Sequence, residues 1–185
     1  LSFWKRYANP QASSWWQGWF FLGLAVLTKG PVAFVLTGLT LGIFCYFQSD
    51  FKRFWQLINP FRGLLLLCLI SVPWYLLELI VEGQPFWDSF FGYHNFQRLT
   101  TVVNSHLQPW WYFFPVAIIS SLPFTPLLFL GVFKTSSELI ERGFPSKQPP
   151  KFSLKIFSFC WLVSVLFLFT CAATKLPSYW LPATP

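Results

Sequence analysis

The sequence contains no methionine and few charged residues. Asp, Glu, Lys and Arg make up only 10% of its 185 residues, against about 25% in a typical soluble domain. Hydrophobic residues account for 55% and aromatic residues for 22% of the chain, with 24 Phe and 11 Trp. A compact soluble core of this size cannot hide so much apolar surface. A soluble domain is therefore excluded, and a lipid-facing exterior is expected.

Position 1 is not Met, and the sequence stops at Pro185 without a polar tail, so we expect an excerpt of a longer protein. The four cysteines all lie inside apolar runs, without a CxxC pair or a Cys/His spacing suited to zinc, which predicts apolar packing rather than metal binding or disulfides. The net charge of +7 falls between apolar runs and forms no stripe, so no nucleic-acid partner is expected.

Five apolar stretches predict an all-α, polytopic membrane domain with about five transmembrane helices. The stretches are residues 15–28, 31–47, 63–81, 110–133 and 156–174. The last three reach the length of about 20 residues that a membrane helix needs. The first two are short, and only a break at Lys29-Gly30-Pro31 separates them.

The first two stretches form either one kinked helix or a tight hairpin. Basic pairs stand on both sides of them, at Lys5-Arg6 and at Lys52-Arg53. Cytoplasmic loops carry the excess of Lys and Arg, and only a hairpin keeps both pairs on one side. Proline also removes a backbone donor and disfavours helix in the residue before it. The hairpin is therefore the favoured interpretation.

Alternation from the hairpin places residues 1–14, 48–62 and 134–155 in the cytoplasm, and the turn near 29, the loop 82–109 and the C-terminal end outside. Of the 13 Lys and Arg residues, the cytoplasmic segments hold Lys5, Arg6, Lys52, Arg53, Arg62, Lys134, Arg142, Lys147, Lys151 and Lys155. Only Lys29, Arg98 and Lys175 fall on the outer face. Each of the three either snorkels to lipid phosphate or joins the others in binding a phosphate or pyrophosphate group.

The outer loop 82–109 carries both histidines, His94 and His106, together with many aromatic residues. We expect short interfacial helices in it, because Phe86, Trp87, Phe90 and Phe91 repeat at helical spacing. A structural role is the favoured interpretation of both histidines. Metal binding with Glu82 and Asp88, and acid–base chemistry by His94, are the alternatives.

Three strings, taken in order, carry a resemblance to a known family. They run from Leu27 to Ala33, from Tyr93 through His106 to Tyr112, and from Thr174 to Pro185. Their order and spacing resemble the bacterial aminoarabinose transferase-like glycosyltransferases, of the protein O-mannosyltransferase superfamily with the GT-C membrane fold. The resemblance covers nearly the whole chain.

The resemblance implies a polyprenyl-phosphate-linked sugar donor, a lipid (lipid A-like) or protein acceptor, and transfer on the periplasmic side of the bacterial inner membrane. It also implies that donor phosphate contacts lie at Lys29, Arg98 and Lys175, with Tyr179 beside them. By the same resemblance, His94, Asn95 and His106 shape the loop and the sugar pocket.

One departure concerns the catalytic base. The family carries an acidic motif in its first outer loop, and no such motif precedes Lys29 here. The base is therefore not assigned, and the chain by itself is expected to be inactive. No cofactor is assigned either, and a divalent metal in the longer protein stays an open alternative.

A second class of function is a non-enzymatic transporter or flippase for a lipid-linked sugar. Transporters usually carry polar or charged groups at mid-span. The middles of the five stretches hold only Ser, Thr and Cys as polar residues, which favours chemistry at the outer surface.

Overall fold

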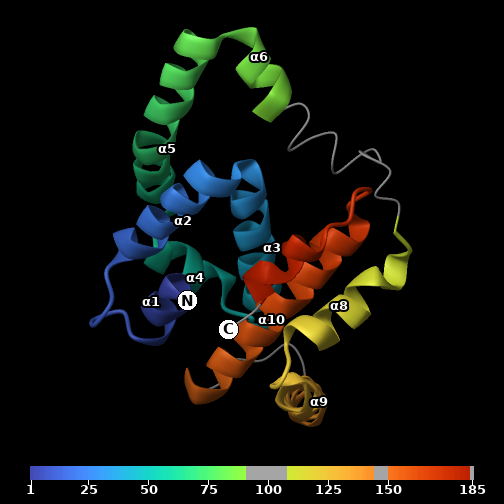
Figure 1. Cartoon of the computed structure of the whole chain (residues 1–185). Helices are drawn as coiled ribbons and strands as arrows, with labels where there is room; N and C mark the ends of the chain where they lie inside the picture. Colours follow the sequence, from blue (N-terminus) through green and yellow to red (C-terminus); the bar gives the residue numbers. More distant parts are fainter. Residues whose placement is uncertain (91–107, 144–149, 184–185) are drawn as a thin grey trace.

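The computed structural model describes residues 1–90, 108–143 and 150–183, and within these ranges all regular structure is helical (Figure 1). The helices are α1 (Ser2–Ala8), α2 (Trp15–Lys29), α3 (Pro31–Gln48), α4 (Phe51–Ile58), α5 (Pro60–Glu82), α6 (Gln84–Trp87), α8 (Phe113–Ser120), α9 (Thr125–Arg142) and α10 (Pro150–Cys171), with 3-10 turns η2 (Trp110–Tyr112) and η3 (Pro177–Ala183). The predicted all-α fold class is confirmed.

Helices α2 and α3 form a hairpin rather than one kinked helix. The chain turns at Gly30, whose φ of 75° is a backbone conformation that glycine adopts without strain. Pro31 then occupies the first turn of α3, where its missing N–H costs no hydrogen bond. Lys29 is the last residue of α2, and its positive charge interacts favourably with the helix dipole there.

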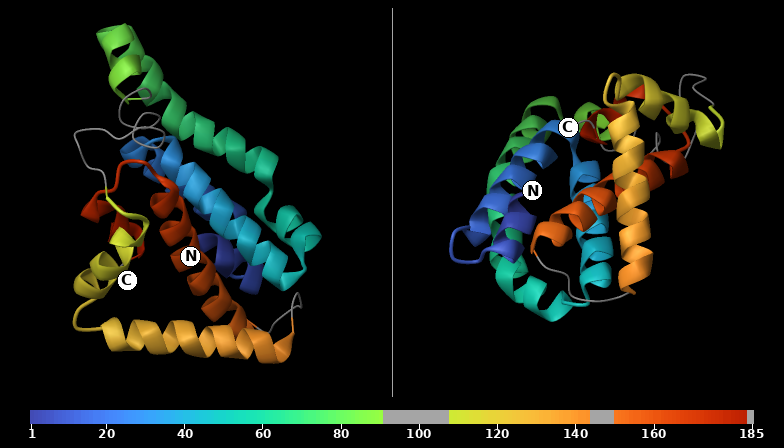
Figure 2. Two further views of the ribbon diagram at one scale, coloured as in Figure 1. Left: turned by 90° about the vertical axis from the view of Figure 1, so that its right-hand side faces the viewer. Right: turned by 90° about the horizontal axis from the view of Figure 1, so that it is seen from below.

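The long helices pack side by side in the order α5, α2, α3, α10 (Figure 2). The core includes the interface between α3 and α10, where the rings of Phe44 and Phe157 meet edge to face at 5.5 Å between centroids. Phe44 and Ile156 are completely buried in this layer. Between two helices that can span a membrane, such contacts stabilise through close van der Waals packing rather than through removal of apolar surface from water.

The short helices α1 and α4 pack together at the end of the bundle opposite the α2–α3 turn. Tyr7 of α1 donates a hydrogen bond to a carboxylate oxygen of Asp50 at 3.2 Å, and the Arg53 guanidinium lies 5.5 Å from the centre of the Tyr7 ring. Burial, together with the negative charge of Asp50, raises the pKa of Tyr7 to about 12. These contacts bring the two basic segments that flank the hairpin to the same end of the molecule.

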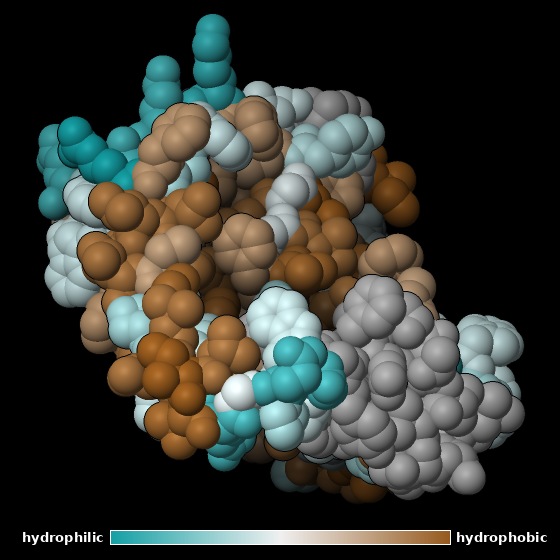
Figure 3. Space-filling model, turned by 90° about the horizontal axis from the view of Figure 1, so that it is seen from above, coloured by the Kyte–Doolittle hydropathy of each residue, from teal (hydrophilic) through white to brown (hydrophobic). Residues whose placement is uncertain are grey.

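Three described helices are long and apolar enough to cross a membrane, namely α3, α5 and the Phe152–Cys171 part of α10. Most large side chains of α5 are exposed, among them Leu69, Leu77 and Ile80. Figure 3 shows hydrophobic residues over most of the coloured surface at the end that carries α6. This is the apolar exterior that the composition predicts.

The stretch 110–133, predicted as a single span, is not one helix. Helices α8 and α9 take its place, with a bend of 119° between the helical segments on either side of the break. Pro123 and Pro126 stand at the break and at the first turn of α9, where a proline ring is tolerated. Helix α9 then runs on to Arg142, beyond the predicted end at 133.

Two further differences concern helix boundaries. Helix α10 begins at Pro150, before the predicted start at residue 156, and ends at Cys171, before the predicted end at residue 174. Its first turns pack on α9, where Lys155 forms an ion pair with Glu138 at 3.1 Å.

In the outer loop, the expected short helix is present as α6, and the rings of Phe86 and Phe90 stack at 5.5 Å.

Candidate functional site

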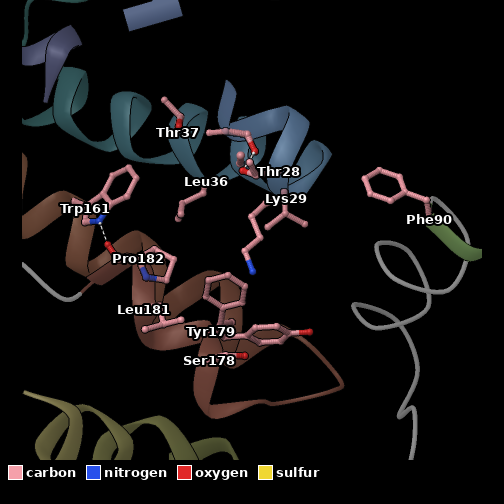
Figure 4. A pocket seen from close by; sticks show the side chains of 14 residues that line it. Thr28, Lys29, Leu36, Thr37, Phe90, Trp161, Ser178, Tyr179, Leu181 and Pro182 are labelled. Atoms are coloured by element: carbon pink, nitrogen blue, oxygen red, sulfur yellow. Dashed lines mark hydrogen bonds between the residues drawn. The ribbon is translucent and has the colours of Figure 1, made fainter. Parts of the chain in front are cut away.

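A cavity of about 500 Å³ lies where the α2–α3 turn meets the C-terminal segment (Figure 4). It is lined by Ala25, Thr28, Lys29, Val32, Ala33, Leu36, Thr37, Phe90, Trp161, Phe169, Ser178, Tyr179, Leu181 and Pro182. Its wall therefore combines residues from the segments 25–37 and 161–182 with Phe90 of the outer loop. Two of the recognised strings, near Lys29 and near Tyr179, meet here.

Lys29 supplies the positive charge of the cavity. Its position at the last turn of α2 is fixed by the Gly30 turn, where the Gly30 N–H donates to the Val26 carbonyl at 2.7 Å. The side chain is exposed and extends toward the segment that carries Ser178 and Tyr179 (Figure 4). The ammonium is thus presented to the cavity rather than to a carboxylate of the described residues.

Tyr179 reaches the same cavity from η3. Its ring stacks on Phe169 of α10, with 4.7 Å between ring centres and 28° between ring planes. This contact holds the phenol against the bundle while its hydroxyl group stays available at the cavity wall, with Ser178 as its neighbour. A cation and hydroxyl donors together suit a phosphate oxygen.

Apart from Thr28 and Thr37, the remaining wall is largely apolar. Val32 and Leu36 of α3, Phe169 of α10 and Leu181 of η3 supply aliphatic and aromatic surface. Leu36 and Phe169 also belong to a buried cluster with Phe113 and Val165, which makes this wall firm. A long hydrocarbon chain fits such a wall, and a charged headgroup fits the rim that Lys29 forms.

Lys175 lies outside the cavity lining. It is buried just after α10, and its Nζ donates a hydrogen bond to the Ala172 carbonyl at 3.2 Å. A cation at this position satisfies a carbonyl at the helix C-terminus and interacts favourably with the dipole. An ammonium has three N–H donors, so donation to this one carbonyl leaves two for a further group.

Four of the residues singled out from the sequence, Arg98, His94, Asn95 and His106, lie outside the described residues. The described part of the same loop ends at Phe90, which lines the cavity and contacts the Tyr75 ring at 5.4 Å. The described part of the loop therefore reaches the cavity at its last residue, Phe90.

Sequence reasoning missed Trp161 and Phe169. Both line the cavity from one face of α10, and Trp161 donates its indole N–H to the Pro182 carbonyl at 2.7 Å. In the sequence they stand in a run rich in Phe and Leu, so nothing distinguishes them from ordinary lipid-facing residues. The only available signal was their spacing of eight residues, which puts them on the same helix face.

Acids are absent from the cavity lining as far as the structure describes it. Within residues 1–90, 108–143 and 150–183, no group of three or more His, Cys, Asp and Glu side chains is placed to hold a metal ion. The described lining therefore offers an ammonium and hydroxyl groups, and no catalytic base is assigned among the described residues.

Comparison with protein-family models gives no match. Among curated proteins, the chain is 29% identical over 185 residues to the undecaprenyl phosphate-alpha-4-amino-4-deoxy-L-arabinose arabinosyl transferase of Erwinia tasmaniensis, covering 98% of this chain and 31% of that protein. It is 31% identical to the second such transferase of Proteus mirabilis, covering 86% and 27%. The chain thus spans about a third of the length of these relatives.

Solved structures give the same result for the fold. The crystal structure of ArnT from Cupriavidus metallidurans bound to undecaprenyl phosphate matches with a TM-score of 0.78 at 24% identity, covering 98% of this chain and 31% of that one. The apo form of the same protein matches with a TM-score of 0.68, covering 89% of this chain and 27% of that one. The predicted resemblance to aminoarabinose transferases is confirmed, and the fold is that of a multi-pass membrane protein.

Proposed function

We propose that this chain forms part of a membrane glycosyltransferase that takes a sugar from a polyprenyl-phosphate-linked donor on the periplasmic face of the bacterial inner membrane. The acceptor is a lipid of the lipid A type or a protein. The observation that carries the proposal is the cavity shared by Lys29 and Tyr179, with an apolar wall beneath them. The similarity to transferases named for undecaprenyl phosphate supports it.

The two parts of the cavity match the two parts of such a donor. The prenyl chain would lie against Leu36 and Phe169, which are already buried and so cost little further ordering, and against the exposed Leu181. The phosphate would lie at the rim, where the Lys29 ammonium and the Tyr179 hydroxyl both donate hydrogen bonds. Charge-assisted hydrogen bonds of this kind are about twice as strong as neutral ones.

The chemistry follows from where charge develops. As the bond between the sugar and the phosphate breaks, negative charge builds on the departing lipid phosphate. A cation held in a partly dry cavity stabilises that charge more than a water-screened one does. Lys29 takes this role in our proposal, and Arg98 and Lys175 supply further positive charge. His94, Asn95 and His106 shape the sugar pocket from the outer loop.

Lys175 fits this scheme through its burial. Burying an ammonium is costly unless its donors are satisfied, and its described partner is the Ala172 carbonyl alone. A phosphate nearby would satisfy the remaining donors. Lys175 would then donate hydrogen bonds both to the Ala172 carbonyl at the end of α10 and to the phosphate of the donor.

Binding of two matched lipids tests the proposal. Undecaprenyl phosphate and undecaprenol differ only in the phosphate, and their dissociation constants with the protein in nanodiscs are measured by native mass spectrometry. Lys29→Ala should weaken binding of undecaprenyl phosphate about 10- to 100-fold, the equivalent of a charged hydrogen bond of about 1.5–3 kcal/mol. Binding of undecaprenol should not change, and Lys52→Ala in α4, at the end of the bundle opposite the α2–α3 turn, should bind both lipids like the parent.

Turnover of a lipid-linked sugar supplies the second readout. The longer protein that contains this chain should release undecaprenyl phosphate and attach the sugar to an acceptor lipid or protein, and Tyr179→Phe in that protein should slow this release. If Lys29→Ala binds undecaprenyl phosphate as tightly as the parent does, the proposed phosphate site is contradicted. Passage of the intact lipid-linked sugar across the membrane, without cleavage, would identify a transporter instead.

A further inference from the structure

The 3-10 segment η3 forms one wall of the cavity and is held to α10 at two points. The Trp161 indole N–H donates to the Pro182 carbonyl at 2.7 Å, and the Tyr179 ring stacks on Phe169. Between these points Trp180 is almost completely buried, with 2% of its surface exposed. Figure 4 shows the hydrogen bond between Trp161 and Pro182 beside the cavity.

The two contacts pair the segments in opposite directions, Trp161 with Pro182 and Phe169 with Tyr179. Residues 161 and 169 lie on the same face of α10, about 12 Å apart along its axis at 1.5 Å per residue. Residues 179 and 182 are one turn apart in η3, because side chains three residues apart align in a 3-10 helix. The segment therefore folds back along α10, and each contact on η3 has its own partner on α10.

A short 3-10 segment does not hold its position by itself. Its hydrogen-bond geometry is poorer than that of an α-helix, and runs longer than three or four residues are uncommon. The Tyr179 N–H donates to the Leu176 carbonyl at 3.1 Å, but this bond shapes the turn and does not place it on α10. Placement depends on packing of the buried Trp180 and on the contacts of η3 with α8 and α10.

The two contacts with α10 differ in what they fix. Stacked rings slide over one another at little cost, so the Tyr179–Phe169 pair leaves the phenol free to shift along the cavity wall. A hydrogen bond weakens steeply when its angle falls from its preferred range. The Trp161–Pro182 bond thus fixes where η3 lies along α10, and with it the position of the Tyr179 hydroxyl.

We propose that Trp161 is a positioning residue that holds η3 on α10 so that Tyr179 faces the donor phosphate opposite Lys29. The assignment rests on the function proposed above for this cavity. Trp161 itself contributes no group to the phosphate. It acts through Tyr179, by keeping the phenol where a charged oxygen can accept its hydrogen bond.

Trp161→Phe tests the assignment, because it keeps an aromatic ring and removes the N–H donor. The chain offers a matched control in Trp4→Phe, since the Trp4 indole N–H donates to the Ser153 hydroxyl at 3.1 Å near the other end of α10. Each variant loses one indole hydrogen bond that involves α10. Only the first touches the cavity.

Hydrogen exchange of residues 176–183 gives a readout that does not depend on activity. In the protein in nanodiscs, Trp161→Phe should speed exchange of this peptide about 2- to 10-fold, the equivalent of one hydrogen bond of about 0.5–1.5 kcal/mol. Trp4→Phe should leave it unchanged. Unchanged exchange in Trp161→Phe would overturn the assignment.

Kinetics of donor turnover then separate positioning from simple packing. Trp161→Phe should lower kcat/KM for the lipid-linked donor about 2- to 10-fold, in the same direction as Tyr179→Phe, because it acts through the same hydroxyl. Added to Tyr179→Phe, the same substitution should have no further effect, because it acts through the hydroxyl already removed. If Trp161→Phe has the same effect in the parent and in Tyr179→Phe, the assignment is overturned. If the longer protein that contains this chain turns over no lipid-linked sugar, the proposed function fails, and the exchange comparison still decides whether Trp161 positions η3.

Discussion

Gly63 of α5 lies directly beneath the indole of Trp19 of α2. A Cβ added at position 63 would stand 2.0 Å from Cε2 of Trp19, far inside contact distance. The indole has no freedom to move away, because it is buried and its N–H donates to the Ile58 carbonyl at 2.7 Å. The close packing of α2 on α5 therefore depends on the absence of a side chain at this one position.

Gly63→Ala should destabilise the protein through this overlap. Overpacking a tight contact typically costs about 1–3 kcal/mol, and here the Trp19 hydrogen bond is disturbed as well. Gly42→Ala is the matched control, since nothing lies within 4 Å of the corresponding Cβ on α3. Thermal unfolding in detergent should show a lower midpoint for Gly63→Ala only. Equal midpoints for the two variants would show that α2 and α5 separate without cost.

The hairpin of α2 and α3 follows from local sequence, and for that reason it could be predicted. Gly30 and Pro31 stand next to each other, and both act on the backbone alone. The break between α8 and α9 has a similar local signal in Pro123 and Pro126. It was missed because the apolar run through residues 110–133 has the length of one span, and length decided the interpretation.

The site could be predicted only in part, because half of its residues are defined by tertiary contacts. Lys29 and Tyr179 stand in recognisable strings, and the structure places both at one cavity. Lys175 carries the same sequence signal as Lys29, yet it is buried against the end of α10. The difference arises from how the chain folds back after α10, which no local pattern encodes.

Lys29 and Lys175 should respond differently to removal of their charge. Lys29 is exposed, so Lys29→Ala should change the free energy of unfolding by less than about 0.5 kcal/mol, as surface substitutions usually do. Lys175→Ala removes a donor to the Ala172 carbonyl and leaves a gap, at a cost of about 1 kcal/mol or more. Thermal unfolding measures both changes. A larger loss for Lys29→Ala than for Lys175→Ala would contradict the contacts described here.

Tyr7 should make stability fall at high pH. Its pKa is raised by burial to about 12 in the folded chain, against about 10 in the unfolded chain. A group with a raised folded pKa contributes stability that is fully present below pH 10 and is lost as the pH rises toward 12. Tyr7→Phe should therefore reduce the loss of stability between these pH values.

Tyr46→Phe is the control for this measurement, since the Tyr46 side chain is 67% exposed. Denaturant unfolding of both variants at pH 8, 10 and 11 gives the comparison. Tyr46→Phe should follow the parent at all three. The same pH slope in Tyr7→Phe and the parent would show that Tyr7 titrates like a solvated phenol.

The turn at Lys29 should lie outside the cytoplasm, on the opposite side of the membrane from Lys52. Both residues are exposed, and they flank α3, whose 18 residues span about 27 Å at 1.5 Å per residue, close to the thickness of a bilayer core. Most of the basic residues fall in the segments predicted to lie on the same side as Lys52, and by the positive-inside rule this predicts a cytoplasmic location for that end. In a variant whose four cysteines are replaced, a cysteine placed at position 29 should react with a membrane-impermeant thiol reagent added to intact spheroplasts. A cysteine at position 52 should react only after permeabilisation, and the reverse pattern would place the cavity on the cytoplasmic face and remove the periplasmic assignment.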